Sequence, residues 1–79
     1  LNTNVSIFPN PTNDIVTIST DNKSITGIEI YSTTGRLVAR KDGLNTSVYQ
    51  FDHLKLSSGM YVINIRFNEG TITEKLIVE

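Results

Sequence analysis

The sequence contains no cysteine, and this absence excludes three kinds of chemistry at once. The chain cannot form disulfide bonds, hold a metal ion through thiolates or attack a substrate with a thiol. It also lacks an excess of charge of either sign, because seven basic side chains stand against eight acidic ones. A formal net charge of −1 gives no long-range field that would attract nucleic acid or an anionic membrane, so we expect neither as a partner.

Long apolar runs are missing as well. No stretch approaches the ~20 residues that a membrane helix requires, and no charged segment followed by an apolar one begins the chain. The first residue is Leu1 rather than methionine, so we expect the chain to be part of a longer protein. Its 79 residues suit one domain, with residues 1–4 as the end of a linker and residues 5–79 as the domain.

Helical periodicity is absent too, since no segment places apolar residues at helical spacing over three turns. The segment 59–67 instead alternates with period two, and its larger side chains share one face: Tyr61, Ile63, Ile65 and Phe67. Successive strand residues face opposite sides of a sheet, so this pattern predicts a long strand with one buried face. We expect it to lie centrally in its sheet.

Shorter patterns predict six further strands, over residues 5–8, 14–19, 25–32, 36–40, 47–52 and 71–78. Turn residues separate them, including Gly35 and the Asp42-Gly43 pair. About seven short strands at this spacing predict an all-β, immunoglobulin-like antiparallel β-sandwich with Greek-key connections. Residues 53–58 are expected to cross over and to bury Leu54 and Leu56.

Two local features refine this prediction. Pro9-Asn10-Pro11 follows the first strand, and proline cannot donate to a ladder of hydrogen bonds, so that strand should lie at a sheet edge or corner. In the last strand Glu74 falls on the same face as the apolar residues. This position predicts either a bulge or a solvent-exposed stretch there.

Few residues are candidates for catalysis or for metal or ligand binding. His53 is the only histidine, and the carboxylates are scattered singly. Asn10, Asn13 and Asp14 are better explained by an Asx turn than by a calcium site. Tyr31 and Tyr49 would form a sugar-stacking platform if both were exposed, although packing is the more common role of such residues. We therefore predict no catalytic, cofactor or metal site, and no enzyme activity.

Four segments taken together carry a resemblance to a known family. They are Phe8-Pro9-Asn10-Pro11-Thr12, the stretch from Ile30 to Val38, Leu56-Ser57-Ser58-Gly59-Met60-Tyr61-Val62, and Glu74-Lys75-Leu76-Ile77-Val78. In this order and spacing the chain resembles the type A C-terminal sorting domain of the type IX (Por) secretion system of Bacteroidota. The resemblance covers essentially the whole chain.

The resemblance implies that the domain is a secretion and sorting signal for a cargo fused to its N-terminal side. The implied partners are the outer-membrane translocon and a sortase-like cysteine protease on the surface, which cuts upstream of the domain. The cargo is then released or joined to an anionic lipopolysaccharide. The implied route leads through the periplasm to the outer membrane, the cell surface or the medium, with the domain itself monomeric.

The family's recognition positions fall here on Gly59, Tyr61, Lys75, Leu76 and Val78, and its structural motif on Pro9, Asn10, Pro11 and Gly35. Two positions depart from the family pattern: Ser58 stands where proline is frequent, and Glu79 where a basic residue is common. An alternative from another class is a non-catalytic carbohydrate-binding or adhesive sandwich. That alternative predicts a shallow aromatic platform.

Overall fold

The computed structural model describes residues 2–9, 14–52 and 55–79, and these residues form strands and no helix. The strands are β1 (Val5–Phe8), β2 (Val16–Thr20), β3 (Ile25–Ser32), β4 (Leu37–Lys41), β5 (Val48–Phe51), β6 (Gly59–Phe67) and β7 (Gly70–Val78). All their pairings are antiparallel. The predicted all-β class is therefore confirmed. Within the described ranges, nothing helical is long and apolar enough to cross a membrane.

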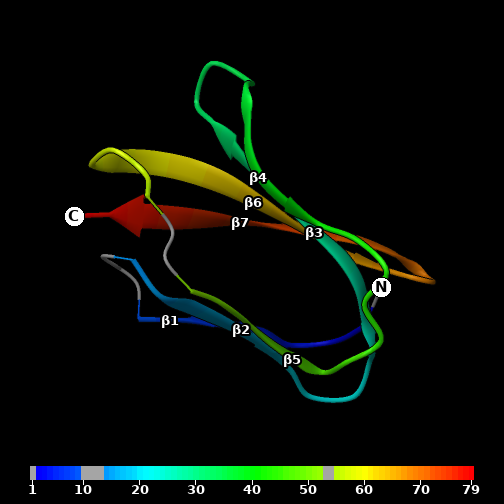
Figure 1. The fold of residues 1–79 in the computed structure, drawn as a ribbon. Helices are drawn as coiled ribbons and strands as arrows, with labels where there is room; N and C mark the ends of the chain where they lie inside the picture. The colour runs from blue at the N-terminus through cyan, green and yellow to red at the C-terminus, as the bar shows by residue number, and fades with distance from the viewer. Residues whose placement is uncertain (1, 10–13, 53–54) are drawn as a thin grey trace.

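The strands form two sheets that face each other as a sandwich (Figure 1). One sheet has the order β1-β2-β5, and the other has the order β4-β3-β6-β7. The connections after β2, β4 and β5 pass from one sheet to the other, which gives the interleaved topology of a Greek-key sandwich. β6 lies between β3 and β7, and β1 lies at an edge, as the sequence predicts.

The position of β4 distinguishes this sandwich from the constant-type immunoglobulin arrangement. There, the fourth strand extends the sheet of the first, second and fifth strands. Here β4 stays beside β3, because a short turn at Gly35 folds the chain back at once. The tip of this hairpin projects away from the body of the sandwich (Figure 1).

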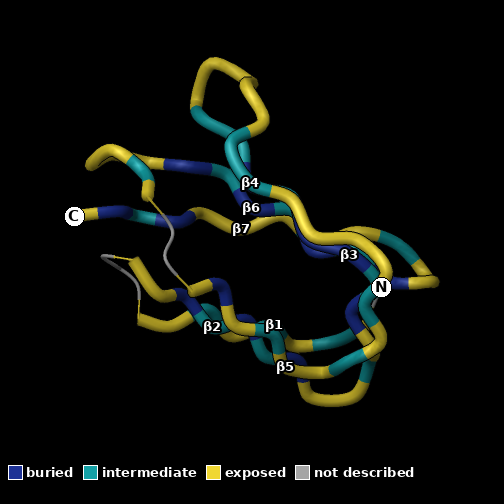
Figure 2. Tube along the Cα trace, viewed as in Figure 1, coloured by how far each residue is buried: buried dark blue, intermediate teal, exposed yellow. Residues whose placement is uncertain are grey.

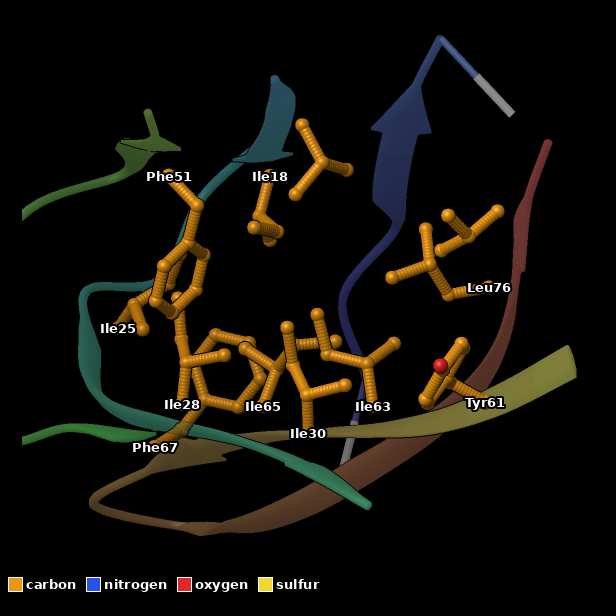
Figure 3. Close-up of a cluster of buried hydrophobic side chains, with 12 residues drawn as sticks. Ile18, Ile25, Ile28, Ile30, Phe51, Tyr61, Ile63, Ile65, Phe67 and Leu76 are labelled. Carbon is orange, nitrogen blue, oxygen red and sulfur yellow. The ribbon is translucent and has the colours of Figure 1, made fainter. Parts of the chain in front are cut away.

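The core consists of side chains from the inner faces of both sheets. Figure 3 shows them filling the space between the layers. Eight are fully buried: Val16, Ile18, Ile25, Ile28, Ile30, Ile63, Ile65 and Leu76. Each fully buried side chain of this size contributes about 1.5–3 kcal/mol relative to exposure, so burial is the main stabilising term of a domain without disulfides.

Irregularities in β3 and β4 let more residues reach the core than strict alternation allows. Ile25 and Ile28 have opposite parity, yet both are buried, because the register against β6 shifts between Ile25 and Gly27. A second shift, between β3 and β4, lets Val38 and Ala39 both pack against the core. Such bulges reverse which parity faces inward.

Four strands have boundaries that differ from the prediction by one or two residues. β2 runs from Val16 to Thr20 rather than from Asp14 to Ser19. Its last residue stays in the strand because the Thr20 side chain is buried and its N–H donates to Ser47 O at 2.8 Å. Ile15, which breaks the alternation, is exposed. β4 is shifted forward by one residue, β5 is shorter than predicted by one residue at each end, and β7 begins one residue earlier, at Gly70.

In the last third of the chain, the burial of individual residues decides between the alternatives that the sequence left open. β7 pairs with β6 without a register shift, and residues 73–75 are exposed, so Glu74 marks a solvent-exposed stretch and not a bulge (Figure 2). Leu56 is partly buried and packs against the core. Leu54 lies outside the described residues.

Candidate recognition surface

All five predicted recognition residues lie on the β6–β7 hairpin, and the register brings them together. Gly59 is the cross-strand partner of Val78, and Tyr61 is the partner of Leu76. Lys75 lies one position along β7, opposite Val62. Directly opposed residues of an antiparallel pair have Cβ atoms about 4.5–5.5 Å apart. Two segments far apart in sequence therefore form one local cluster.

Within this cluster Tyr61 is a structural anchor. The residue is 8% exposed, and its hydroxyl donates to the Ser57 carbonyl at 2.7 Å. Tyr61 lies near the start of the sixth strand, and the bond returns to the backbone four residues upstream. This geometry matches the tyrosine corner of immunoglobulin-like sandwiches. The bond fixes the entry of the chain into β6.

Gly59, Leu76 and Val78 also hold the fold. Gly59 has φ of +149°, a value that residues with a Cβ rarely adopt, so the first residue of β6 must be glycine for conformational reasons. Leu76 is fully buried and Val78 is 3% exposed. A partner protein cannot touch these two side chains while the domain is folded.

Gly59 is exposed but has no side chain, so Lys75 is the member of the cluster whose side chain a partner can reach. It is exposed on the outer face of the four-stranded sheet, because alternation sends Leu76 inward and its neighbour outward. An open hollow of about 450 Å³ lies beside it, lined by Val62, Thr73, Glu74 and Lys75. The cluster therefore combines buried anchors with one exposed cation.

The residues of the predicted structural motif are placed only in part. Pro9 follows β1, and the Phe8–Pro9 peptide bond is cis. Asn10 and Pro11 lie outside the described residues. Gly35 forms the β3–β4 turn with φ of +89°, and its N–H donates to Ser32 O at 3.0 Å. A positive φ of this kind favours glycine, so Gly35 has a clear conformational role.

The structure does not assemble the aromatic platform of the carbohydrate-binding alternative. Tyr31 lies on β3 of the four-stranded sheet, and Tyr49 lies on β5 of the other sheet. The Tyr49 ring packs against the core and meets the Phe51 ring edge to face, with centroids 5.0 Å apart. One flat surface therefore cannot contain both tyrosine rings.

Metal chemistry finds no support in the part of the chain that the structure describes. No group of three or more His, Asp or Glu side chains within those residues is arranged to hold an ion. His53, Asn10 and Asn13 lie outside the described residues.

Sequence reasoning missed a hydrogen-bonded clasp between the N-terminal segment and the β2–β3 loop. The Asp21 carboxylate accepts from Thr3 Oγ1 at 2.7 Å, from Asn4 N at 3.1 Å and from Asn4 Nδ2 at 3.0 Å. The Thr3 hydroxyl and then the Asn4 backbone N–H lower the pKa of Asp21 below its ordinary 3.8. The clasp holds Thr3 and Asn4 against the domain.

This clasp predicts a pH-dependent stability difference between the wild type and Asp21→Asn. The lowered folded-state pKa means that the ionised form stabilises the fold fully above pH 3.8, and that this stabilisation is lost as the pH falls through the lowered value. The midpoint of urea unfolding should therefore be higher for the wild type than for Asp21→Asn at neutral pH. In strong acid the two midpoints should be equal. Thr3→Val should shrink the neutral-pH difference. A difference that persists or grows in acid would contradict the assignment.

A second unpredicted feature is an ionic network at one end of the outer face of the four-stranded sheet. Arg66 Nε lies 2.9 Å from Glu29 Oε2, as an ion pair without hydrogen-bond geometry, and Arg66 Nη2 also reaches Asp42. Arg40 Nε donates to the other Asp42 oxygen at 2.8 Å. Burial raises the pKa of Asp42, but the bonds from Arg40 and Arg66 outweigh it and lower the pKa overall. The registers of β3 with β4 and β6, together with the turn after β4, place these side chains together.

The described residues define a small β-sandwich in which buried anchors on the β6–β7 hairpin lie beside the exposed side chain of Lys75. The sequence profile of a family described as "Secretion system C-terminal sorting domain" matches residues 6–79. The chain belongs to this family, the C-terminal sorting domains of the type IX secretion system, and is a sorting signal for export to the cell surface or beyond.

A comparison with curated proteins gives a relative of much greater length. The chain is 36% identical over 75 residues to an ulvan lyase of Nonlabens ulvanivorans. The match covers 94% of this chain and 14% of the lyase. The chain therefore corresponds to a small part of that protein.

Proposed function

We propose that this domain directs an upstream cargo through the type IX machinery by being recognised as a folded unit. The cargo and domain reach the periplasm together, and the outer-membrane translocon binds the domain there. A sortase-like cysteine protease then cuts on the N-terminal side of the domain. The cargo is released or is attached to lipopolysaccharide.

The observation that carries this proposal is the family match over residues 6–79, which spans nearly the whole chain. The geometry supports recognition of a folded unit, because Leu76 and Val78 are buried and act through the shape that they maintain. The ulvan lyase relative is compatible with a large enzyme as cargo, since the match is 14% of that protein. Recognition roles for Gly59, Tyr61 and Lys75 belong to the same proposal.

The test is export of a reporter. A monomeric reporter with an inner-membrane leader is joined to the N-terminal side of this chain and produced in a host with a type IX system. We expect the reporter in the medium or on the surface, and its retention in the periplasm when residues 75–79 are deleted or when the translocon is absent. Equal export of the intact and the shortened fusion would contradict the role of the terminal strand.

Cleavage of the domain from its cargo is measured separately from export. Mass spectrometry of the exported reporter identifies its new C-terminus, which we expect upstream of Thr3 because the Asp21 clasp holds Thr3 and Asn4 against the domain. A reporter that reaches the medium with the whole domain still attached would refute removal by a protease, while leaving the sorting role intact.

A further inference from the structure

The Asp21 clasp lies where the N-terminal segment enters the sandwich, and it binds backbone as well as side-chain groups. The Asp21 N–H donates to Asn4 O at 3.3 Å, while the Asp21 carboxylate accepts from Asn4 N and Asn4 Nδ2. Val5 and Thr20 are the last registered pair of β1 and β2, so the clasp extends this ladder by one position. Both backbone groups of Asn4 are therefore bonded to a single residue.

β1 itself is held less firmly than the other strands of the core. It has four residues, lies at a sheet edge and pairs with β2 alone. Val5 and Ile7 are only partly buried against the core, and the eight fully buried side chains all belong to other strands. Segments with few buried contacts open at a lower free energy than the whole domain. β1 and the clasp therefore form a unit that can open while the rest of the sandwich stays folded.

Asp21 supplies the side-chain bonds that close this unit. Within the described ranges, the side-chain hydrogen bonds between residues 2–4 and the rest of the domain all involve its carboxylate. The neighbouring Lys23 instead pairs with Glu69, at 3.5 Å, between the β2–β3 loop and the β6–β7 turn. Hydrogen bonds to an ionised acceptor are roughly twice as strong as neutral ones, so the Asp21 carboxylate makes the strongest bonds to this segment.

We propose that Asp21 fixes the downstream limit of cleavage, because the closed clasp withholds the peptide bonds from Thr3 onward from a protease and leaves the preceding linker as its substrate. The inference rests on the proposed removal of the domain from its cargo. A protease binds an extended segment whose backbone groups are free, and a peptide bond within a closed strand pair becomes available only through local opening. Asp21 is thus a positioning residue and takes no part in the reaction itself.

The step that the clasp positions is the scission of one peptide bond. The cysteine sulfur of the protease displaces the amino group on the domain side, which takes up a proton, and water or an amine then takes the acyl group of the cargo from the thioester. With the clasp closed, the cut precedes Thr3 and the departing domain keeps the whole of β1. A cut inside β1 would separate Val5 or Ile7 from the core against which they pack.

The experiment is limited proteolysis of the full chain joined to the C-terminal end of a monomeric reporter, with proteinase K as the probe and mass spectrometry of both products. The wild type should be cut before Thr3. Asp21→Ala should be cut within residues 3–8 about ten times faster than the wild type, because cleavage of a rapidly opening segment follows the population of its open form. Thr3→Val removes one carboxylate bond without changing the β2–β3 loop, so it should raise the same rate by a smaller factor.

Two controls test whether the opening is local and specific. Lys23→Ala changes the same loop without removing a clasp bond, so its cut sites and rates should match the wild type. The β6 segment 59–67 should resist the protease equally in the wild type, Asp21→Ala and Thr3→Val. If both clasp variants expose β6 as fast as β1, the clasp does not open as a separate unit and the inference is wrong. It is equally wrong if both variants keep the wild-type cut sites and rates.

Export of the same fusions separates this inference from the proposed function. In a host with a type IX system the exported wild-type reporter should end before Thr3, and part of the Asp21→Ala reporter should end within residues 3–8. Removal at an unchanged position in Asp21→Ala would overturn the role of Asp21 and leave the sorting function intact. A wild-type reporter that keeps the whole domain would refute removal itself, and the inference would fall with it.

Discussion

Leu76→Ala is expected to unfold a large fraction of the domain at ambient temperature. Leu76 is fully buried opposite Tyr61 on an edge strand, and truncation of a buried leucine costs about 2–5 kcal/mol through lost transfer energy and the remaining cavity. A domain of this size buries only about 60% of its unfolded surface, so its total stability is small enough for this loss to matter. Urea unfolding followed by circular dichroism measures the effect.

Two matched variants separate packing from direct recognition. Leu76→Met conserves volume and should cost less than about 1.5 kcal/mol, so both stability and export should survive. Lys75→Ala changes an exposed neighbour and should alter stability by no more than about 0.5 kcal/mol. A Leu76→Ala domain that stays as stable as the wild type but loses export would show that a partner reads Leu76 directly, against the buried position found here.

The sequence alone predicts only part of this division between buried and exposed residues. The period-two pattern of residues 59–67 predicts both the strand and its buried face, because side-chain alternation is a property of any single strand. The same reasoning left two explanations for Glu74. The choice depends on where β7 sits: as an edge strand it can expose a charge on its inward parity, which an interior strand cannot do at low cost.

The alternation pattern of a single strand does not indicate which strands pair with it or in which register. Ile25 and Ile28 contradict simple alternation, and only the bulge opposite β6 explains how both are buried. The proximity of Tyr61 to Leu76 follows from the β6–β7 register, which the short turn after Phe67 sets. A family resemblance can therefore indicate which positions matter, but the register is needed to divide them into anchors and contacts.

The clasp and the ionic network are side-chain contacts between distant segments, which sequence patterns do not indicate. Asp21 and Asp42 both occur in turn-like segments, where acidic residues are common for reasons of local geometry alone. Asn4 is 17 residues from Asp21, and Arg66 is 24 residues from Asp42, so both contacts join different elements. Neither composition nor periodicity indicates such pairs, since they arise where two loops or strands meet in the finished fold.

Arg66→Ala is expected to cost about 2–3 kcal/mol, which is large for a side chain on an outer face. Hydrogen bonds and close pairs with charged groups contribute about 1.5–3 kcal/mol, and Glu29, with a side chain 12% exposed, would lose its cation. The guanidinium also lies directly against Gly27, where an added Cβ would overlap it. Urea unfolding of Arg66→Ala, Glu29→Ala and the double variant gives the coupling energy, which should exceed 1 kcal/mol, about the upper limit for exposed pairs.

Gly27→Ala offers an independent check of the same arrangement. It should destabilise the wild type by displacing the guanidinium from Glu29 and Asp42, and it should cost much less in the Arg66→Ala background. Lys23→Ala is the control, because its pair with Glu69 is 3.5 Å long and exposed and should contribute about 0–1 kcal/mol. An Arg66→Ala variant no less stable than Lys23→Ala would contradict a structural role for the network and would leave Gly27 without its packing explanation.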